Sequence, residues 1–456
     1  MMWEWVCGIA GERGGPYTGP RYHITSEKYK AQKEEHVTGF SGCSVSLLVQ
    51  VVLVQAFSIG IISFLGKWEK KCLVIRSFIE FVLVIIPMLL SVTLAELIPW
   101  ILAVQISMLI VAMFRFAKFG TPEQLRALNK DPTKPWLSAF RSANLLLTQI
   151  SILAVDFRIF PRFFAKTETF GISLMDVGVG SFIISNGLSA NSSRFGSFSK
   201  TLKSTTPLLL LGFSRLFSIK AANYQEHVSE YGVHWNFFFT LAFVALFASQ
   251  VYPDQALFVG VLSLAGHEIL LQYFGVSDYV VHSKRSFNLL SANKEGVFSL
   301  PGFIALYLIG CWIGNQLRRP RSYRNWWKVV FYLSILGVLS LTIAVMFQGL
   351  ISRRLANSLY CLTILGLSAI FLAVALSISL LNPSGAILVS SFSLGINNNQ
   401  LVLFLCSNLL TGIINLSMQT LYMDCATSFL ILIIYGSILF TLSVTLGEFK
   451  LKLKFW

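Results

Sequence analysis

Long apolar runs recur along the chain, and most of them approach the length of about twenty residues that an α-helix needs to cross a bilayer. They lie at 44–65, 74–95, 97–117, 138–157, 171–190, 206–222, 234–252, 255–274, 298–316, 327–349, 356–381, 399–420 and 425–446. Lipid leaves no water to satisfy backbone polar groups, so a chain that crosses it in separate runs crosses as helices. We therefore predict an all-α polytopic membrane protein with about thirteen transmembrane helices.

Charged residues make up only 12% of the 456 residues, whereas ordinary soluble domains contain about a quarter. The formal net charge of +15 also occurs in nucleic-acid-binding proteins, but these cations lie in short loops between apolar runs, not in one stripe. Loops that fall on one side of the predicted topology carry many of them (Lys67, Lys70, Lys71, Lys118, Arg126, Lys130, Lys134, Arg194, Lys200, Lys203, Arg318, Arg319, Arg321, Arg324, Lys450, Lys452 and Lys454). Because Lys and Arg mark the cytosolic side, we predict a lumenal N-terminus and a cytosolic C-terminus.

The stretch 149–187 places charges where two apolar runs meet. The first run ends on Asp156, and five further charged residues follow it (Arg158, Arg162, Lys166, Glu168 and Asp176). We predict that Arg158, Arg162, Glu168 and Asp176 contribute to substrate binding. Ionisable groups at membrane depth are costly and usually face a protein interior or a water-filled cavity. Two interpretations stay open from the residues alone. In the first, the cations anchor helix ends and Asp156 forms a structural ion pair with Lys166. In the second, Asp156 is a general base and Lys166 stabilises a developing negative charge.

A second polar cluster precedes the run at 234–252, and by the span count it lies on the same lumenal side (His227, Glu230, His234, Trp235 and Asn236). We predict that it contributes to substrate binding, although a histidine at a helix entrance is often structural. Its spacing does not match a zinc motif, so we expect no metal.

Three more polar features lie near or inside apolar runs. Arg215 is a candidate phosphate partner, and His267 either contacts substrate or pairs internally. The late segment with Asn408, Thr411 and Asn415 either joins helices by hydrogen bonds or lines a lipid headgroup pocket. Basic residues at Lys284, Arg285, Lys294, Arg353 and Arg354 oppose the predicted topology, which favours a role in binding or chemistry.

Several of these segments together resemble a known family. ILAVDFRIFPRFFAKTETFGISLMDVGVGSF (152–182), EHVSEYGVHWNFFFTLA (226–242), LSANKEGVFSLPGFIALYLIG (290–310) and SNLLTGIINLSMQT (407–420) closely resemble the inositol acyltransferases of glycosylphosphatidylinositol (GPI) anchor synthesis. The resemblance runs from about Lys33 to the end of the chain. Asp156 and Lys166 match the family's motif positions regarded as catalytic, and both are intact.

The resemblance implies an enzyme of the endoplasmic reticulum membrane. It implies an acyl-CoA donor, commonly palmitoyl-CoA, and glucosaminyl-phosphatidylinositol as the acceptor, with acylation of the inositol 2-hydroxyl and no cofactor. The expected division is a poorly structured extension at 1–43, one transmembrane acyltransferase domain at 44–446 and a basic cytosolic tail at 447–456. Lys452 and Lys454 in that tail fit either a dilysine retrieval signal or a headgroup anchor.

Two rival classes fit the same composition. A lipid transporter or flippase also has many spans and intramembrane charges, and a non-catalytic subunit of a membrane complex would use the helices only for assembly. No Ser or Cys accompanied by a base stands out, which favours direct acyl transfer over an acyl-enzyme intermediate.

Overall fold

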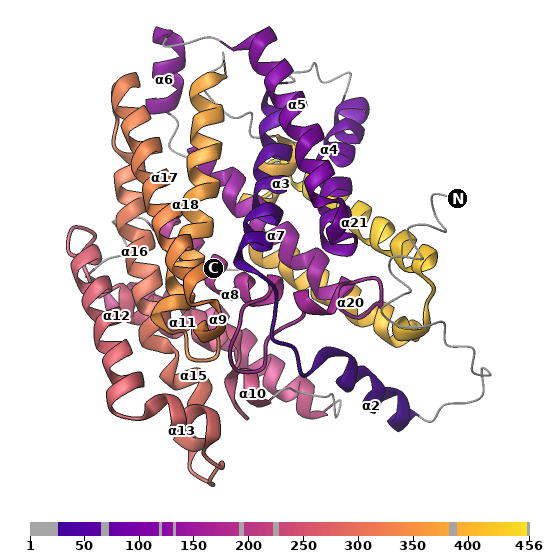
Figure 1. Cartoon of the computed structure of the whole chain (residues 1–456), viewed down its shortest axis with the longest axis vertical. Coiled ribbons are helices and arrows are strands. Elements are labelled where there is room, and N and C mark those ends of the chain that lie inside the picture. Colours follow the sequence, from indigo (N-terminus) through magenta and orange to yellow (C-terminus); the bar gives the residue numbers. More distant parts are fainter. Residues whose placement is uncertain are drawn as a thin grey trace. The chain divides into compact units, whose positions relative to one another are not determined.

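The computed structural model describes residues 26–64, 73–117, 121–130, 134–190, 196–221, 228–382 and 390–453. Helices account for most of these residues, and none of the described ranges contains a β-strand (Figure 1). The all-α class predicted from the apolar runs is therefore confirmed for the part of the chain that the structure describes.

Ten helices within the described ranges are long and apolar enough to cross a membrane. They are α3 (Val45–Phe64), α4 (Leu73–Thr93), α5 (Ile98–Phe116), α7 (Pro135–Ala154), α12 (Ala256–Tyr273), α16 (Leu300–Arg318), α17 (Tyr323–Met346), α18 (Ser358–Leu381), α20 (Gln400–Ser417) and α21 (Cys425–Glu448). Each coincides with a predicted run, which confirms a multi-pass membrane protein. On α5 the side chains of Trp100 and Phe114 are largely exposed, as hydrocarbon-facing residues are in a membrane helix.

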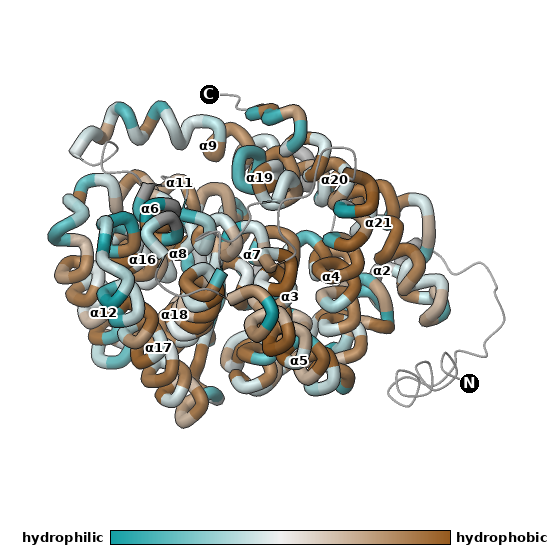
Figure 2. The backbone as a smooth tube through the Cα atoms, turned by 90° about the horizontal axis from the view of Figure 1, so that it is seen from above, coloured by the Kyte–Doolittle hydropathy of each residue, from teal (hydrophilic) through white to brown (hydrophobic). Residues whose placement is uncertain are grey.

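The other three predicted spans fall on α8 (Leu174–Ser189), α9 (Phe198–Ala221) and α11 (Phe237–Ala248). Helices of 16 and 12 residues, as in α8 and α11, extend only about 24 and 18 Å, less than the hydrocarbon thickness of about 30 Å. The 24-residue α9 is long enough, but it carries Lys200, Lys203 and Arg215, and hydrophilic stretches interrupt its tube in Figure 2. A count of thirteen spans and the orientation of the termini stay predictions.

The chain divides into two compact units. Unit 1 comprises 1–166, 320–334 and 370–454, and unit 2 comprises 167–319, 335–369 and 455–456. Unit 1 also contains the short helices α2 (Ser26–Val37), α6 (Pro122–Lys130) and α19 (Ser391–Asn398). Unit 2 also contains α10 (Val228–Tyr231), α13 (Val276–His282), α14 (Leu289–Ala292) and α15 (Lys294–Phe298). The helix α2 lies in the range that the sequence assigns to an extension.

The helix α7 forms the centre of unit 1, where it packs against α3, α4, α19, α20 and α21. Bulky apolar side chains lie on most of its faces, and Trp136, Leu145 and Ile150 are completely buried. A helix with this many bulky apolar side chains is stable only when it is surrounded by other helices or lipid. Its burial places the end of α7, and the turn that follows, against neighbours on several sides.

Glycines bring helices of each unit into backbone contact. In unit 1 a Cβ on Gly395 of α19 would overlap the carbonyl of Ser443, and one on Gly447 of α21 would overlap that of Ser391. In unit 2 the helices α8 and α16 approach equally closely, because Gly314 lies against the carbonyl of Leu188. Small residues at such crossings permit the close packing that stabilises membrane helix bundles.

Candidate active site

The turn after α7 is fixed by one arginine. The helix ends at Ala154, and the 3₁₀ helix η3 (Arg162–Phe164) begins after Pro161. The guanidinium of Arg162 donates hydrogen bonds to the carbonyls of Val155 (3.2 Å), Phe157 (2.8 Å) and Phe160 (2.6 Å), which all point toward it. Burial lowers the pKa of Arg162 to about 10, so the side chain stays charged at neutral pH. This predicted substrate-binding residue therefore shapes the turn that presents Asp156.

The carboxylate of Asp156 lies in a three-membered polar cluster. Its Oδ1 is 3.0 Å from Nζ of Lys33 in α2, and its Oδ2 accepts a hydrogen bond of 2.7 Å from Nδ2 of Asn415 in α20. The ammonium of Lys33 also donates to Oδ1 of Asn415 at 2.9 Å, which closes the ring. The side chains of Lys33 and Asp156 are 22% and 13% exposed, so the cluster is mostly shielded from solvent but remains accessible.

Sequence reasoning missed Lys33, because α2 lies in a charged segment without an apolar pattern. The sequence predicts a helix-joining or headgroup-binding role for Asn415, but its contact with Asp156 depends on a tertiary approach of α20 to the end of α7. The helix α2 is also held by two contacts just beyond the same end of α20: the hydroxyl of Tyr29 lies 3.4 Å from Oγ1 of Thr420, and the ring of Tyr29 packs 5.6 Å from that of Tyr422.

His36 lies beside the same turn. Its carbonyl accepts a hydrogen bond of 3.2 Å from Arg162, and its buried Nε2 has no hydrogen-bond partner among the described residues. Burial, together with the positive charges of Arg162, Arg158 and Lys33, lowers the pKa of His36 to about 4. The imidazole is therefore neutral at physiological pH and adds no charge to the cluster.

Lys166, the second predicted catalytic residue, is half-buried and follows η3 in the same unit as Asp156. Arg158 is exposed on the turn, and Glu168, which belongs to unit 2, is exposed as well. Their roles in catalysis or substrate binding stay predictions.

Asp176, in unit 2, is completely buried and fully bonded. Its Oδ2 accepts hydrogen bonds from the backbone and hydroxyl of Thr167 (3.1 and 2.9 Å) and of Ser173 (3.0 and 2.8 Å). Its Oδ1 lies 2.8 Å from Nε of Arg353. With Ser173 it forms the capping box of α8, so the structure gives Asp176 an architectural role at a helix N-terminus.

Arg353 connects two predicted substrate-binding residues. Besides Asp176, it pairs with Glu230 at 3.4 Å and lies over the ring of Tyr231 at 5.9 Å. The side chain of Arg353 is 6% exposed, so two carboxylates surround a cation that is almost removed from water. Burial and the charge of Glu230 raise the pKa of Tyr231, which stays protonated. Arg353 is one of the basic residues that the predicted topology places on the lumenal side, and its two buried ion pairs account for a cation at that position.

The remaining residues of the second predicted cluster have clear local contacts in unit 2. The backbone N–H of His234 donates to Asn293 at 2.7 Å, and Asn236 caps α11 by accepting from the N–H groups of Phe238 and Phe239. The indole of Trp235 donates to Thr240 at 2.9 Å and stacks on Phe243. His227 lies outside the described residues.

The last two predicted substrate-binding residues lie on different helices of unit 2. Arg215 is exposed on α9. Nε2 of His267 lies 2.9 Å from the carbonyl of Leu355, which ties α12 to the loop that carries Arg353. This contact is the internal pairing that the sequence left open for His267, and its predicted contact with substrate stays a prediction.

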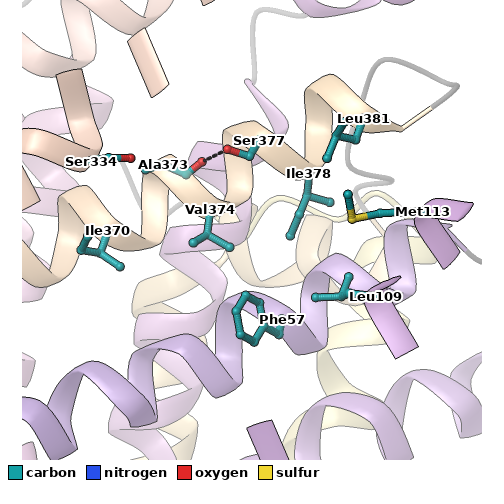
Figure 3. A pocket seen from close by; sticks show the side chains of 10 residues that line it. All are labelled: Phe57, Leu109, Met113, Ser334, Ile370, Ala373, Val374, Ser377, Ile378 and Leu381. Carbon is teal, nitrogen blue, oxygen red and sulfur yellow. Dashed lines mark hydrogen bonds between the residues drawn. The ribbon is translucent and has the colours of Figure 1, made fainter. Parts of the chain in front are cut away.

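An apolar pocket of about 260 Å³ lies elsewhere in unit 1, between α3, α5, α17 and α18 (Figure 3). Val374 and Ile378 of α18 point toward Phe57 of α3 and Leu109 of α5, and the polar groups of the lining are the hydroxyls of Ser334 and Ser377. No titratable side chain lines it. This pocket suits hydrocarbon but supplies no acid or base.

Comparison with known proteins gives a match over most of the chain, because the GWT1 family matches residues 29–446. A Dictyostelium discoideum protein named phosphatidylinositol-glycan biosynthesis class W protein is 32% identical over 94% of this chain and 100% of its own length. GPI-anchored wall transfer protein 1 of Yarrowia lipolytica is 33% identical over 93% of this chain and 99% of its own length. The protein of that name from Schizosaccharomyces pombe is 39% identical over 65% of this chain and 68% of its own length. The resemblance to the GPI inositol acyltransferases seen in the motifs is thus confirmed, and the chain belongs to the GWT1 family.

Proposed function

We propose that this chain is an acyltransferase of the endoplasmic reticulum membrane in GPI-anchor biosynthesis. It transfers an acyl chain, commonly palmitoyl, from acyl-CoA to the inositol 2-hydroxyl of glucosaminyl-phosphatidylinositol. The observation that carries the proposal is the Asp156 carboxylate, which Lys33 and Asn415 hold at the end of a buried membrane helix. The names of the relatives, one for phosphatidylinositol-glycan biosynthesis and two for GPI-anchored wall transfer, support the pathway.

The proposed reaction is a direct transfer. Asp156 accepts the proton of the inositol hydroxyl while the hydroxyl oxygen bonds to the thioester carbonyl carbon. Lys166 stabilises the negative charge that develops on the carbonyl oxygen. The carbon–sulfur bond then breaks, and coenzyme A leaves as a thiol with the proton that Asp156 returns. The products are the acylated inositol and free coenzyme A.

The cluster around Asp156 is compatible with this role. A carboxylate has about four lone-pair directions, and Lys33 and Asn415 each approach a different oxygen. Each oxygen therefore keeps a lone pair for a substrate hydroxyl.

Acyl transfer by the purified full-length protein in nanodiscs tests the proposal. Labelled palmitoyl-CoA and glucosaminyl-phosphatidylinositol should give a labelled, base-labile lipid with the wild-type chain. Asp156→Asn should lower the rate by about a hundredfold to ten-thousandfold, the usual contribution of a general base. Asp278→Asn, the same change at an exposed position of α13, is the matched control and should keep full activity.

Two results would contradict the proposal. Movement of labelled lipid across the bilayer without a labelled product indicates a transporter, and a well-folded Asp156→Asn variant with normal turnover removes Asp156 from the mechanism. Immunofluorescence of the full-length chain against an endoplasmic reticulum marker tests the location separately.

A further inference from the structure

A polar face runs along α7 toward Asp156. Arg141, Asn144, Thr148 and Ser151 follow one another at intervals of three or four residues, so they lie on one side of the helix. The rest of α7 is mostly apolar, and the polar side chains outside this face (Ser138, Ser142 and Gln149) are buried. Polar side chains inside a membrane-spanning helix default to a functional or helix-joining role.

Several groups on this face have no partner. The guanidinium of Arg141 donates from Nη2 to Oε1 of Gln400 at 2.7 Å, but its buried Nε is unbonded. Nδ2 of Asn144 and Oγ of Ser151 are likewise buried and unbonded within the described part of the chain. Thr148 donates to the carbonyl of Asn144 at 2.8 Å, which leaves its hydroxyl oxygen able to accept.

The charge of Arg141 is the strongest of these observations. Among the described residues it forms no ion pair, and its one hydrogen-bond partner is a neutral amide of α20. An uncompensated cation at membrane depth is expensive, and a guanidinium presents a fork of donors that matches the oxygens of a phosphate. A phosphate is therefore a chemically suitable partner for Arg141.

We propose that Arg141 binds a phosphate of the acyl-CoA donor and that Asn144 and Ser151 bind the polar pantetheine arm. This inference rests on the proposed acyl-CoA-dependent function. The amide and hydroxyl groups of the arm supply the acceptors and donors that the polar face of α7 lacks. The arm then leads along α7 toward the turn that carries Asp156.

The distance from Arg141 to Asp156 indicates that the phosphate belongs to the acyl-CoA donor and not to the acceptor lipid. From Arg141 to the end of α7 at Ala154 the helix rises about 20 Å. In the acceptor the phosphate sits on the ring carbon next to the one that bears the reacting hydroxyl, so it must lie within a few ångström of the base. In coenzyme A the extended pantetheine arm separates the phosphates from the thioester, as this geometry requires.

Direct binding to the full-length protein in nanodiscs tests the assignment without any acyl transfer. Three probes are compared: coenzyme A, pantetheine without phosphates, and phosphatidylinositol incorporated in the nanodisc. Arg141→Gln should weaken the binding of coenzyme A by about tenfold to a hundredfold, the range for a lost charged hydrogen bond, and leave the other two unchanged. Arg115→Gln removes the same charge from an exposed position at the end of α5 and should change none of them.

Each other outcome overturns the assignment. Loss of phosphatidylinositol binding with normal coenzyme A binding would assign the phosphate to the acceptor, and no effect on any probe would leave Arg141 a purely structural, hydrated residue. The wild-type chain alone provides a second test, because equal affinity for coenzyme A and pantetheine would mean that no phosphate is bound. If Arg141→Gln fails to fold, Arg141→Lys retains the charge but lacks the fork, and it should also bind coenzyme A more weakly than the wild type.

The binding experiment on Arg141 and the acyl-transfer experiment on Asp156 can fail independently. A chain that binds coenzyme A through Arg141 but makes no acylated lipid would keep this inference and lose the proposed transfer. A chain that makes the lipid but binds coenzyme A independently of Arg141 would do the reverse.

Discussion

Lys33→Met should separate the positioning of Asp156 from its chemistry. The change removes the ammonium 3.0 Å from the carboxylate and keeps an unbranched side chain of similar length. At an effective dielectric constant of 20, the gross attraction at that distance is about 5.5 kcal/mol. Desolvation of the two charges offsets part of this attraction. The side chains of Lys33 and Asp156 are 22% and 13% exposed, so the pair is intermediate between two cases. Exposed ion pairs contribute about 0–1 kcal/mol, and breaking a buried pair costs about 3–5 kcal/mol. We expect a loss of about 1–3 kcal/mol in the free energy of unfolding.

The acyl-transfer rate should fall as well, because a carboxylate held by Asn415 alone is free to rotate away from the substrate hydroxyl. Lys33→Arg should retain most of the activity, since it keeps the charge. Lys28→Met, on an exposed position of the same helix, is the matched control.

A double-mutant cycle with Asp156→Asn provides the decisive measurement of the pair. Once the carboxylate is neutral, Lys33→Met no longer leaves an unpaired negative charge, so most of its cost in thermal stability should disappear. A coupling between contacting residues is typically about 0.5–3 kcal/mol. Strictly additive effects on stability, together with an unchanged rate in Lys33→Met, would refute the idea that Lys33 holds the carboxylate.

Three further predictions concern stability, measured by thermal unfolding in detergent. Because the pKa of His36 is lowered from 6.5 to about 4, the unfolded chain takes up the proton first, so stability should fall as the pH drops from about 6.5 to 4, and His36→Phe should flatten this dependence. Gly447→Ala should destabilise the chain by about 1–3 kcal/mol through overpacking against α19, whereas Gly412→Ala, which has open space around it, should not; equal effects would contradict the packing argument. Arg353→Met should cost about 3–5 kcal/mol by leaving buried Asp176 unpaired, and a second change of Asp176→Asn should recover part of that loss.

The helical spans were predictable because each depends on local composition. A run of apolar residues is helical in a membrane whatever it packs against, so ten runs became ten helices. Hydropathy does not mark where a helix begins, as the runs at 171–190 and 234–252 illustrate. Ser173 and Asn236 begin α8 and α11 inside those runs, and the helices are shorter than the apolar segments.

The candidate site was predictable only in part. Asp156 stood out because a carboxylate at the end of an apolar run is unusual. Lys33 did not, because its significance depends on a residue far along the chain. Asp176 has a local signal in the sequence, because Ser173 three residues before it gives the pattern of a capping box. Its partner Arg353 comes from another loop, and no local pattern connects the two.

The bonds of Arg162 to three carbonyls have a consequence for the energetics of the proposed catalysis. A loop that must rearrange when charge moves adds reorganisation energy to the barrier, whereas groups already fixed in place do not. Arg162 donates hydrogen bonds to the carbonyls of Val155, Phe157 and Phe160. These bonds fix the backbone around Asp156 to the end of α7. The backbone that carries Asp156 is thus held in place before any substrate binds, and a change in α20 can remove the partner Asn415 while the bonds of Arg162 to the turn remain.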